Sequence, residues 1–286
     1  MKKRLALLGA LAVLLLGSVY VSRGFVRDFW DSLNAPNLPV AKPFQPQPEG
    51  GDFQGVDAPS SVEGGYATSQ NYILESNPTV KKKPVEEKKS ASELPDEVNL
   101  DVPFTAQAPH QNWDMPYQEA CEEAAVIMMD GFFKGQSGKI SADAADEAIK
   151  KIVAFENAQY GFYEDTTALQ TAQLIKDYYG YTNITVKPFD SADDIKSVLA
   201  EGYPVLIPAA GKLLHNPNFK NGGPPYHMLV IRGYTPDFFI TNDPGTRKGQ
   251  GYVYTYDTIL EAAHDWTGSK DTVQNGDRVM IVVRPN

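Results

Sequence analysis

The sequence is poor in cysteine, since Cys121 is the only one among 286 residues. A disulfide framework within one chain needs an even number of cysteines, so the sequence excludes it. Structural zinc sites and dithiol redox sites built on a CxxC pair are excluded for the same reason. The lone thiol is left with three roles: pairing with another chain, inert packing in the core, or reactivity.

Positive charge is also scarce, with 26 lysines and arginines against 36 aspartates and glutamates and a formal net charge of -10. Binding to a nucleic-acid backbone requires a basic surface, so nucleic acid is not an expected partner. The sequence shows no internal repeat and no glycine-rich loop of the phosphate-binding kind. We therefore expect no cofactor.

Long hydrophobic runs are absent except for residues 5–22, which carry no charge. As a helix this run would span about 27 Å, close to the hydrocarbon thickness of a bilayer. The preceding Lys2, Lys3 and Arg4 predict that residues 1–4 stay in the cytoplasm and that the rest lies outside, at the cell surface or in the periplasm. No Ala-x-Ala cleavage site or lipidatable cysteine follows the run. We expect an uncleaved transmembrane anchor, with a removed signal sequence as the alternative.

Residues 23–95 are rich in proline and lack any hydrophobic period. Nine of the 21 prolines fall between Pro36 and Pro95, and the stretch KKKPVEEKKSASELPDE alternates blocks of opposite charge. Such composition favours extended, solvated chain. The prediction is a disordered linker from 23 to 95, followed by a domain over 96–286.

Within 96–286, helical patterns come first and strand patterns follow. Apolar residues recur at helical spacing in 120–133, and the segments 141–158, 165–180 and 190–202 carry capping signals such as Ser141 and Gly180. After Pro204 come short runs rich in β-branched and aromatic residues, at 204–209, 226–234, 238–244, 251–256 and 278–284. Pro236 and Asp237 predict a hairpin between the second and third of these runs. The expected fold is therefore α+β, with N-terminal helices packed on a C-terminal antiparallel sheet.

Cys121 falls at the start of the first predicted helix, in QEACEEAAVIMMDGFF. The free N–H groups at a helix N-terminus favour thiolate over thiol and lower the pKa of a cysteine there. Glu122 and Glu123 oppose this effect. A nucleophilic role for Cys121 therefore requires a nearby base, and histidine is the usual one.

Of the four histidines, His227 has the context of a base because it begins a predicted strand after the loop NGGPPY. Asp243 ends the next strand, 16 residues later. If the two strands form a hairpin, the carboxylate can orient the imidazole, which gives the nucleophile, base and orienting acid of a catalytic triad with Cys121.

Each of these residues also has a structural interpretation. Cys121 can be an inert core thiol, His227 a buried histidine with its polar atoms satisfied, and Asp243 a turn former in NDPG. A zinc site made from Cys121, His227, Asp243 and His215 is a further alternative, although no close ligand pair supports it.

Three segments resemble the C39-like cysteine peptidases in sequence and order: VPFTAQAPHQNWDMPYQEACEEAAVIMMDGFF, PPYHMLVIRGY and ITNDPGTRKGQGYVYTY. The resemblance implies a papain-like fold, in which the helix bearing the nucleophile packs against an antiparallel sheet bearing histidine and aspartate. It implies that Cys121 is the nucleophile, His227 the general base and acid, and Asp243 the residue that orients the imidazole.

The resemblance also implies a glutamine that stabilises the oxyanion, and Gln107 matches it by the Val-Pro context before it. Gln107 precedes Cys121 by 14 residues, a longer gap than in the bacteriocin-processing members, so Gln111 and Gln118 remain alternatives. Those members also have glycine where this chain has Glu122, and they are fused to an ABC transporter that is absent here. The chain resembles the stand-alone, surface-anchored branch more closely.

The expected function is that of a membrane-anchored, extracytoplasmic cysteine peptidase that hydrolyses peptide amide bonds through an acyl-enzyme. Its partners would be peptide or protein substrates, with cell-wall peptides included. Two alternatives stay open: a catalytically silent peptide-binding module, and a cell-wall amidase or transpeptidase with the same triad. Trp113, Tyr117 and Tyr226 either line the substrate groove or pack in the core.

Overall fold

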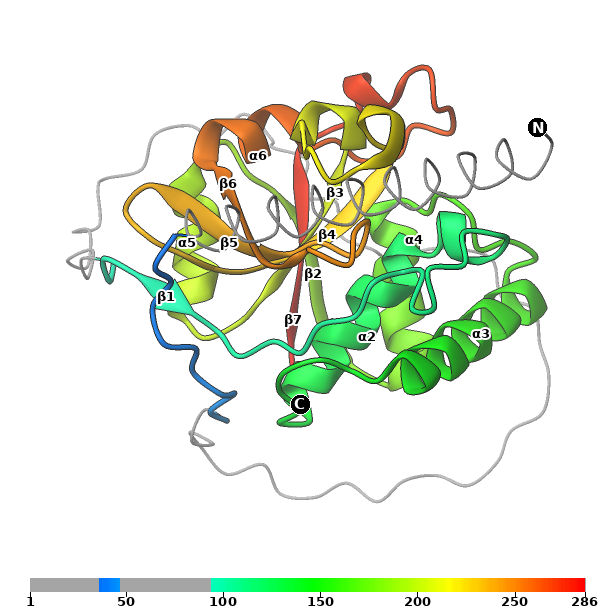
Figure 1. Cartoon of the computed structure of the whole chain (residues 1–286), viewed down its shortest axis with the longest axis horizontal. Helices are drawn as coiled ribbons and strands as arrows, with labels where there is room; N and C mark the ends of the chain where they lie inside the picture. The colour runs from blue at the N-terminus through cyan, green and yellow to red at the C-terminus, as the bar shows by residue number, and fades with distance from the viewer. Residues whose placement is uncertain (1–35, 47–93, 286) are drawn as a thin grey trace, which may run out of the picture.

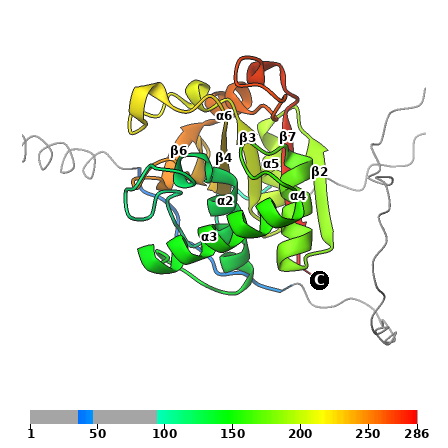
Figure 2. The ribbon, with the colours of Figure 1, turned by 90° about the vertical axis from the view of Figure 1, so that its right-hand side faces the viewer.

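An antiparallel sheet with helices packed against it forms the body of the structure, a computed structural model that describes residues 36–46 and 94–285. The longer helices are α2 (Cys121–Phe133), α3 (Ala142–Gln159), α4 (Ala168–Tyr179), α5 (Ala192–Ala200) and α6 (Tyr256–Ala262). The strands are β1 (Val98–Asn99), β2 (Asn183–Pro188), β3 (Val205–Ala209), β4 (His227–Tyr234), β5 (Phe238–Asn242), β6 (Gln250–Thr255) and β7 (Val279–Arg284). Helices α2, α3 and α4 lie together beside the sheet in both views (Figures 1 and 2). The α+β prediction is confirmed.

The pairing of the strands brings the start of β4 and the end of β5 to one end of the sheet. The path is β2-β7-β3-β4-β5-β6, with β1 paired to β4, and all these pairs are antiparallel. Strands β4 and β5 form the predicted hairpin, closed by the bond from Thr235 N to Phe238 O. Because antiparallel neighbours run in opposite directions, the first residue of β4 and the residue after β5 share one end of the sheet. His227 and Asp243 occupy those two positions.

The two central strands are covered on both faces. Every residue of β3 and β4 is buried, which requires packing on both sides of the sheet. Helix α2 packs against β4, and α5 packs against β3 and β4. The sheet therefore holds the start of β4 rigidly.

Helix α2 is buried more completely than its sequence pattern predicts. The predicted apolar face contains Ala124, Met128 and Phe132, but all residues from Cys121 to Phe132 are buried. A helix buried all round lies inside the domain instead of on its surface. For this reason the carboxylates in its first turn lie in the protein interior.

The other helices begin and end close to their predicted signals. Ser141 Oγ accepts a hydrogen bond from Ala144 N at the start of α3, and Thr167 forms a capping box with Gln170 at the start of α4. Gly180 ends α4 with a φ of 81°. The sequence patterns missed the edge strand β2, the two-residue strand β1 and the short helix α6.

Residues 36–46 correct the prediction of a linker over 23–95. Lys42 N donates to Asn99 O at 2.8 Å, and Asn99 Nδ2 donates to Pro39 O at 2.7 Å. The Phe44 ring lies 5.5 Å from that of Phe132 and 5.2 Å from that of Phe133. An aromatic contact and backbone pairing offset the entropy cost of ordering this short piece. The domain therefore includes chain from before its predicted start at 96.

The predicted anchor at 5–22 lies outside the residues that the structure describes. Within 36–46 and 94–285, none of the helices combines the length and the apolar character that crossing a bilayer requires.

Candidate active site

Cys121 is the first residue of α2 and is almost completely buried, with 5% of its surface exposed. Its Sγ donates a hydrogen bond to Glu122 Oε2 at 2.9 Å. Burial raises the pKa of the Cys121 thiol well above its ordinary value, and the negative charge of Glu122 adds to the effect. The expectation that the helix N-terminus lowers this pKa is therefore wrong for this conformation. A backbone hydrogen bond from Met228 opposes the rise without cancelling it.

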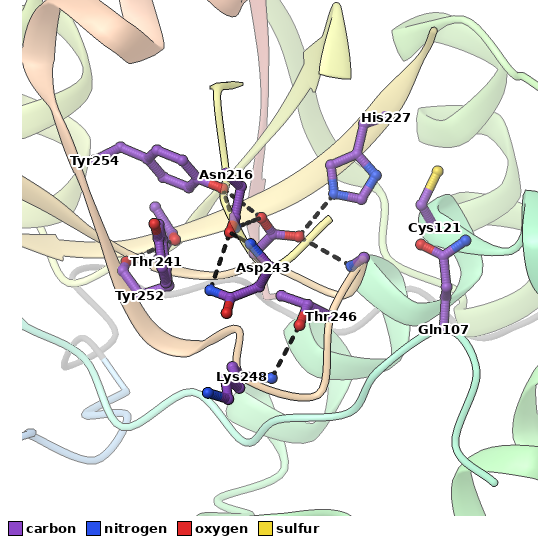
Figure 3. Close-up of polar contacts among 12 residues, drawn as sticks. Gln107, Cys121, Asn216, His227, Thr241, Asp243, Thr246, Lys248, Tyr252 and Tyr254 are labelled. Carbon is purple, nitrogen blue, oxygen red and sulfur yellow. Dashed lines mark hydrogen bonds and ion pairs between the residues drawn. The ribbon is translucent and has the colours of Figure 1, made fainter. Parts of the chain in front are cut away.

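His227 and Asp243 form a buried pair at the shared end of β4 and β5. His227 Nε2 lies 2.8 Å from Asp243 Oδ1, and both side chains are fully buried. The other ring nitrogen, Nδ1, is buried and has no hydrogen-bond partner among the described residues. Figure 3 shows this free nitrogen on the side of the ring that faces Cys121. The three side chains that the sequence singled out thus come together, with the imidazole between the carboxylate and the thiol.

Asp243 is held by four donors, which fix it as a carboxylate. Besides His227, Tyr254 Oη donates to Oδ2 at 2.5 Å, Asn216 Nδ2 to Oδ2 at 3.2 Å and Gly245 N to Oδ1 at 2.9 Å (Figure 3). Burial by itself would raise the pKa of Asp243, but the charge of His227 and these hydrogen bonds hold it below its ordinary value. A negative charge of fixed orientation therefore faces His227.

The backbone around Asp243 is equally constrained. Asp243 N donates to Gly249 O at 3.0 Å, and a Cβ on Gly249 would fall 1.8 Å from Asp243 O. Only glycine permits this close approach. The close packing of Gly249 on Asp243 therefore fixes the backbone of the aspartate in the turn after β5.

Of the three candidate glutamines, only Gln107 is buried next to the start of α2. Its Nε2 donates to the carbonyl oxygens of Tyr117 at 3.0 Å and Gln118 at 3.2 Å, in the turn that leads into Cys121. Gln118 is exposed and Gln111 is exposed and accepts a bond from Arg247. The long gap between Gln107 and Cys121 is thus closed in space, because the intervening loop folds back. In this conformation the amide hydrogens of Gln107 are directed at those carbonyls.

The remaining histidines lie away from this cluster. His110 is exposed and pairs with Asp143 at 3.1 Å, His215 is exposed, and His264 Nδ1 lies 2.8 Å from Gly276 O. The zinc alternative needed His215 as a fourth ligand, but His215 is exposed whereas the side chains of His227 and Asp243 are fully buried. Across the described part of the chain, no group of three or more His, Cys, Asp or Glu side chains is arranged to hold a metal ion.

The three aromatic residues singled out earlier differ in their surroundings. Trp113 is 47% exposed in the loop before α2. Tyr117 is buried and its hydroxyl bonds to Asp146, whereas Tyr226 is buried and donates to Thr166 O at 2.7 Å. Core packing therefore accounts for Tyr117 and Tyr226, and Trp113 alone is available at the surface.

A cavity of about 470 Å³ lies between the loop before α4 and residues 266–268. The Trp266 ring, which lines it, lies 5.2 Å from that of Tyr226, the residue before His227. Asp165 and Thr167 line the same cavity, and Thr166 between them bonds to Glu122. A ligand in this cavity would contact Asp165 and Thr167, which flank Thr166, and Trp266, which packs on Tyr226.

Sequence reasoning missed Asn216, Tyr254 and the contact that Glu122 makes with the thiol. Tyr254 alternates inward on β6, a signal that a strand reading of GYVYTY could have supplied. Asn216 lies in an irregular loop after Leu214, where no periodicity points to it. The contact of Glu122 depends on the loop 160–167 folding over the start of α2, which local sequence does not reveal.

Replacing Tyr254 with phenylalanine is expected to weaken the site without destroying it. The change removes one donor from Asp243 and leaves three, so we expect turnover to fall by no more than about tenfold, equivalent to about 1.4 kcal/mol. The peptide hydrolysis that the sequence resemblance implies, measured against pH, checks this result. Tyr256→Phe, whose hydroxyl bonds to Thr235 O instead of to Asp243, is the matched control and should leave the rate unchanged. A loss as large as that caused by replacing Asp243 itself would show that Tyr254 does more than hold the carboxylate.

The chain is similar to known proteins in sequence and in structure. A family model described as "Peptidase_C39 like family" matches residues 99–273. Among solved structures, a crystal structure of a protein from Bacillus anthracis assigned as a C39-like peptidase is similar with a TM-score of 0.44 and 15% identity, covering 67% of this chain and 99% of that one. No curated protein matches the chain at a significant level. The matched region contains helices α2 to α6, strands β2 to β6 and all the clustered side chains.

Proposed function

Because the chain belongs to the Peptidase_C39 like family, and has its α+β papain-like fold, we propose that it is a cysteine peptidase that hydrolyses peptide amide bonds. Cys121 would be the nucleophile, His227 the general base and acid, and Asp243 the residue that orients the imidazole. Family membership supports the reaction class, and the arrangement of the side chains supports these roles.

The observation that supports the proposal best is the free Nδ1 of His227. The atom is buried without a partner, while Nε2 on the opposite side of the ring is engaged by Asp243. A histidine that served only packing would have both polar atoms satisfied, because an unpartnered buried nitrogen costs about 1–3 kcal/mol. An imidazole fixed at one nitrogen and open at the other, toward a thiol, suits proton transfer.

The reaction would proceed by acyl transfer. The proton of Cys121 Sγ passes to His227 Nδ1, and the sulfur attacks the amide carbonyl to form a carbon–sulfur bond. His227 then gives its proton to the leaving amine as the carbon–nitrogen bond breaks. Water, deprotonated by His227, then attacks the thioester carbon to form a carbon–oxygen bond. The carbon–sulfur bond breaks, the acid product leaves and His227 gives the proton to sulfur.

The oxyanion would form beside the N-terminus of α2. The backbone N–H of Cys121 is at the first helical position, where N–H groups have no acceptor within the helix. Gln107 would add its amide by turning from the carbonyls of Tyr117 and Gln118, and until then it keeps the turn before Cys121 in place. One such donor contributes about 10²- to 10³-fold in rate.

We also propose that the enzyme acts outside the cytoplasm, held at the membrane by residues 5–22. The basic residues before that run and the proline-rich segment after it support this arrangement. Protease added to spheroplasts, in which both a surface and a periplasmic domain are accessible, should digest the domain, and it should spare the domain if the enzyme is cytoplasmic. Removal of residues 5–22 should release the chain from the membrane fraction.

One observation favours a second function, that of a peptide-binding module without turnover. The Cys121 thiol is hydrogen-bonded to a carboxylate, and burial raises its pKa, so this conformation holds it in the less reactive form. Such a module would bind peptides at the same site and leave them intact.

Hydrolysis of a mixed peptide library by the full chain separates the two functions. We expect the wild type to cleave peptides and Cys121→Ala to lose cleavage while still binding the same peptides. Equal cleavage by both chains would contradict the proposed nucleophile. Binding by the wild type with no cleavage of any peptide, including cell-wall stem peptides, would favour the binding module.

A further inference from the structure

Glu122 contacts the sulfur of the proposed nucleophile and belongs to no role assigned so far. Its side chain is buried, with 1% of its surface exposed, and Oε2 lies 2.9 Å from Cys121 Sγ. Oε1 accepts hydrogen bonds from Thr166 N at 2.8 Å and from Thr166 Oγ1 at 3.5 Å. Both carboxylate oxygens are therefore engaged in the interior.

Thr166 holds Glu122 in this position through a network of its own. Its Oγ1 lies 2.8 Å from Thr171 Oγ1 on α4, and its carbonyl oxygen accepts a bond from Tyr226 Oη at 2.7 Å. Tyr226 directly precedes His227, so the loop before α4 joins the carboxylate to the strand that carries the base. Glu122 cannot leave Sγ without breaking buried hydrogen bonds.

The thiol therefore has two acceptors for one proton. Glu122 Oε2 receives its hydrogen bond in this structure, while His227 Nδ1 faces Cys121 and receives none. A carboxylate next to sulfur disfavours thiolate by charge repulsion, whereas a neutral carboxylic acid donates a hydrogen bond to thiolate and favours it. The protonation of Glu122 thus decides which form of Cys121 is stable.

Resting on the peptidase function proposed above, we propose that Glu122 is a further catalytic residue that controls the nucleophile. As a carboxylate it holds Cys121 as a thiol, and as a carboxylic acid it stabilises the Cys121 thiolate paired with protonated His227. The contact between Glu122 and Sγ therefore disfavours thiolate when Glu122 is ionised and favours thiolate when Glu122 is protonated.

Activation moves one proton within the site and takes up one proton from solvent. The restrained state holds a thiol, the Glu122 carboxylate, a neutral His227 and the Asp243 carboxylate. The thiol proton moves to His227 Nδ1, and Glu122 takes one proton from solvent. The active state then holds thiolate, carboxylic acid, imidazolium and the Asp243 carboxylate, with one negative charge fewer in total.

The surroundings of Glu122 favour its protonation near neutral pH. Burial raises the pKa of Glu122 to about 7, although the hydrogen bonds from Cys121 and Thr166 oppose the rise. Several titratable groups face Glu122 besides the Cys121 thiol and the His227 imidazole. They are Glu123 on α2, Glu156 on α3, Asp165 in the loop before α4 and Tyr226 before β4. The nearby cation, Lys270, is paired with Asp165 at 3.2 Å. Among the described residues, none forms a salt bridge with Glu122. The active state should therefore be populated below about pH 7 and lost above it.

Alkylation of the full chain by iodoacetamide from pH 5 to 9 tests the proposal, because Cys121 is the only thiol. In the wild type we expect the rate to fall by at least about tenfold between pH 6 and 8, one unit on either side of the Glu122 titration. Glu122→Gln keeps a hydrogen-bond donor next to sulfur at every pH. It should remove this fall and label at least about tenfold faster than the wild type at pH 8.

Glu147→Gln is the matched control, since it makes the same change at an exposed position on α3 that is paired with Lys151, without contact to Sγ, and should keep the wild-type profile. Glu122→Met fills the same space without charge and should also lose the fall, so the test survives if Glu122→Gln does not fold. Wild-type and Glu122→Gln profiles of equal shape, both slowed by His227→Ala, would overturn the role of Glu122 alone. Wild-type labelling that is unaffected by His227→Ala would instead overturn the proposed triad.

Discussion

Replacement of His227 with alanine should lower peptide hydrolysis by about 10²- to 10⁴-fold, the usual contribution of a general acid–base residue. The physical reason is the position of Nδ1, which is buried and unpartnered beside Cys121. Without the imidazole, the thiol keeps its hydrogen bond to Glu122, and no group remains that can take its proton and pass it to the leaving amine. Turnover per folded molecule, measured with a fluorogenic peptide that the wild type cleaves, checks this expectation.

The control for this experiment is another histidine on the same domain. His110 is exposed and contacts Asp143, away from the buried pair, so His110→Ala should retain wild-type turnover. Circular dichroism must show that His227→Ala is folded, since removing a partner leaves Asp243 buried with three donors instead of four. A folded His227→Ala chain with more than about a tenth of wild-type activity would exclude His227 as the base, because the expected loss is at least about a hundredfold.

The proximity of His227 and Asp243 could be derived from the sequence because it depends on a local rule. Two strand patterns separated by a turn signal form a hairpin, and a hairpin brings the first residue of one strand near the end of the next. The structure has this register, with Val230 opposite Asn242, next to Asp243. The helix that carries Cys121 was equally predictable from its apolar period and acidic first turn.

What the sequence could not supply are contacts between segments with no local pattern. Thr166 N reaches Glu122 across 44 residues, and Asn216 Nδ2 reaches Asp243 across 27. These contacts decide the protonation of the site, since they hold one carboxylate against the thiol and the other against the imidazole. The burial of α2 on all sides was also hidden, and with it the rise in the pKa of Cys121.

The stability of the domain should decrease as pH rises from about 5 to 8, because three carboxyl groups are buried between α2 and α3. Glu122, Glu123 and Glu156 are each no more than 1% exposed, and neither oxygen of Glu123 has a hydrogen-bond partner among the described residues. Burial raises the pKa of Glu122 to about 7, that of Glu156 to about 8 and that of Glu123 well above its ordinary value. The proximity of Glu156 raises the pKa of Glu123 further.

The sign follows from proton linkage. In the unfolded chain these groups ionise near pH 4.5, so between that pH and the folded-state pKa the folded domain binds more protons than the unfolded chain. Each raised group then removes about 1.4 kcal/mol of stability per pH unit across its window, and the loss is complete above its folded-state pKa. Asp243 acts in the opposite direction. Because its pKa is lowered in the folded domain, it contributes stability that is present above the pKa of the unfolded chain and is lost as pH falls from there through the folded-state pKa.

Urea unfolding of the full chain, followed by circular dichroism from pH 5 to 8.5, measures this slope. Glu123→Gln removes one buried ionisation and keeps the shape of the side chain, so it should flatten the slope and be more stable than the wild type at pH 8. Glu147→Gln, at an exposed position on α3 paired with Lys151, should leave the slope unchanged. Wild-type stability that rises over this range would mean that the three carboxyl groups reach solvent or positive charge. In that case Glu122 would stay ionised throughout, and Cys121 would be restrained at every pH at which the enzyme is folded.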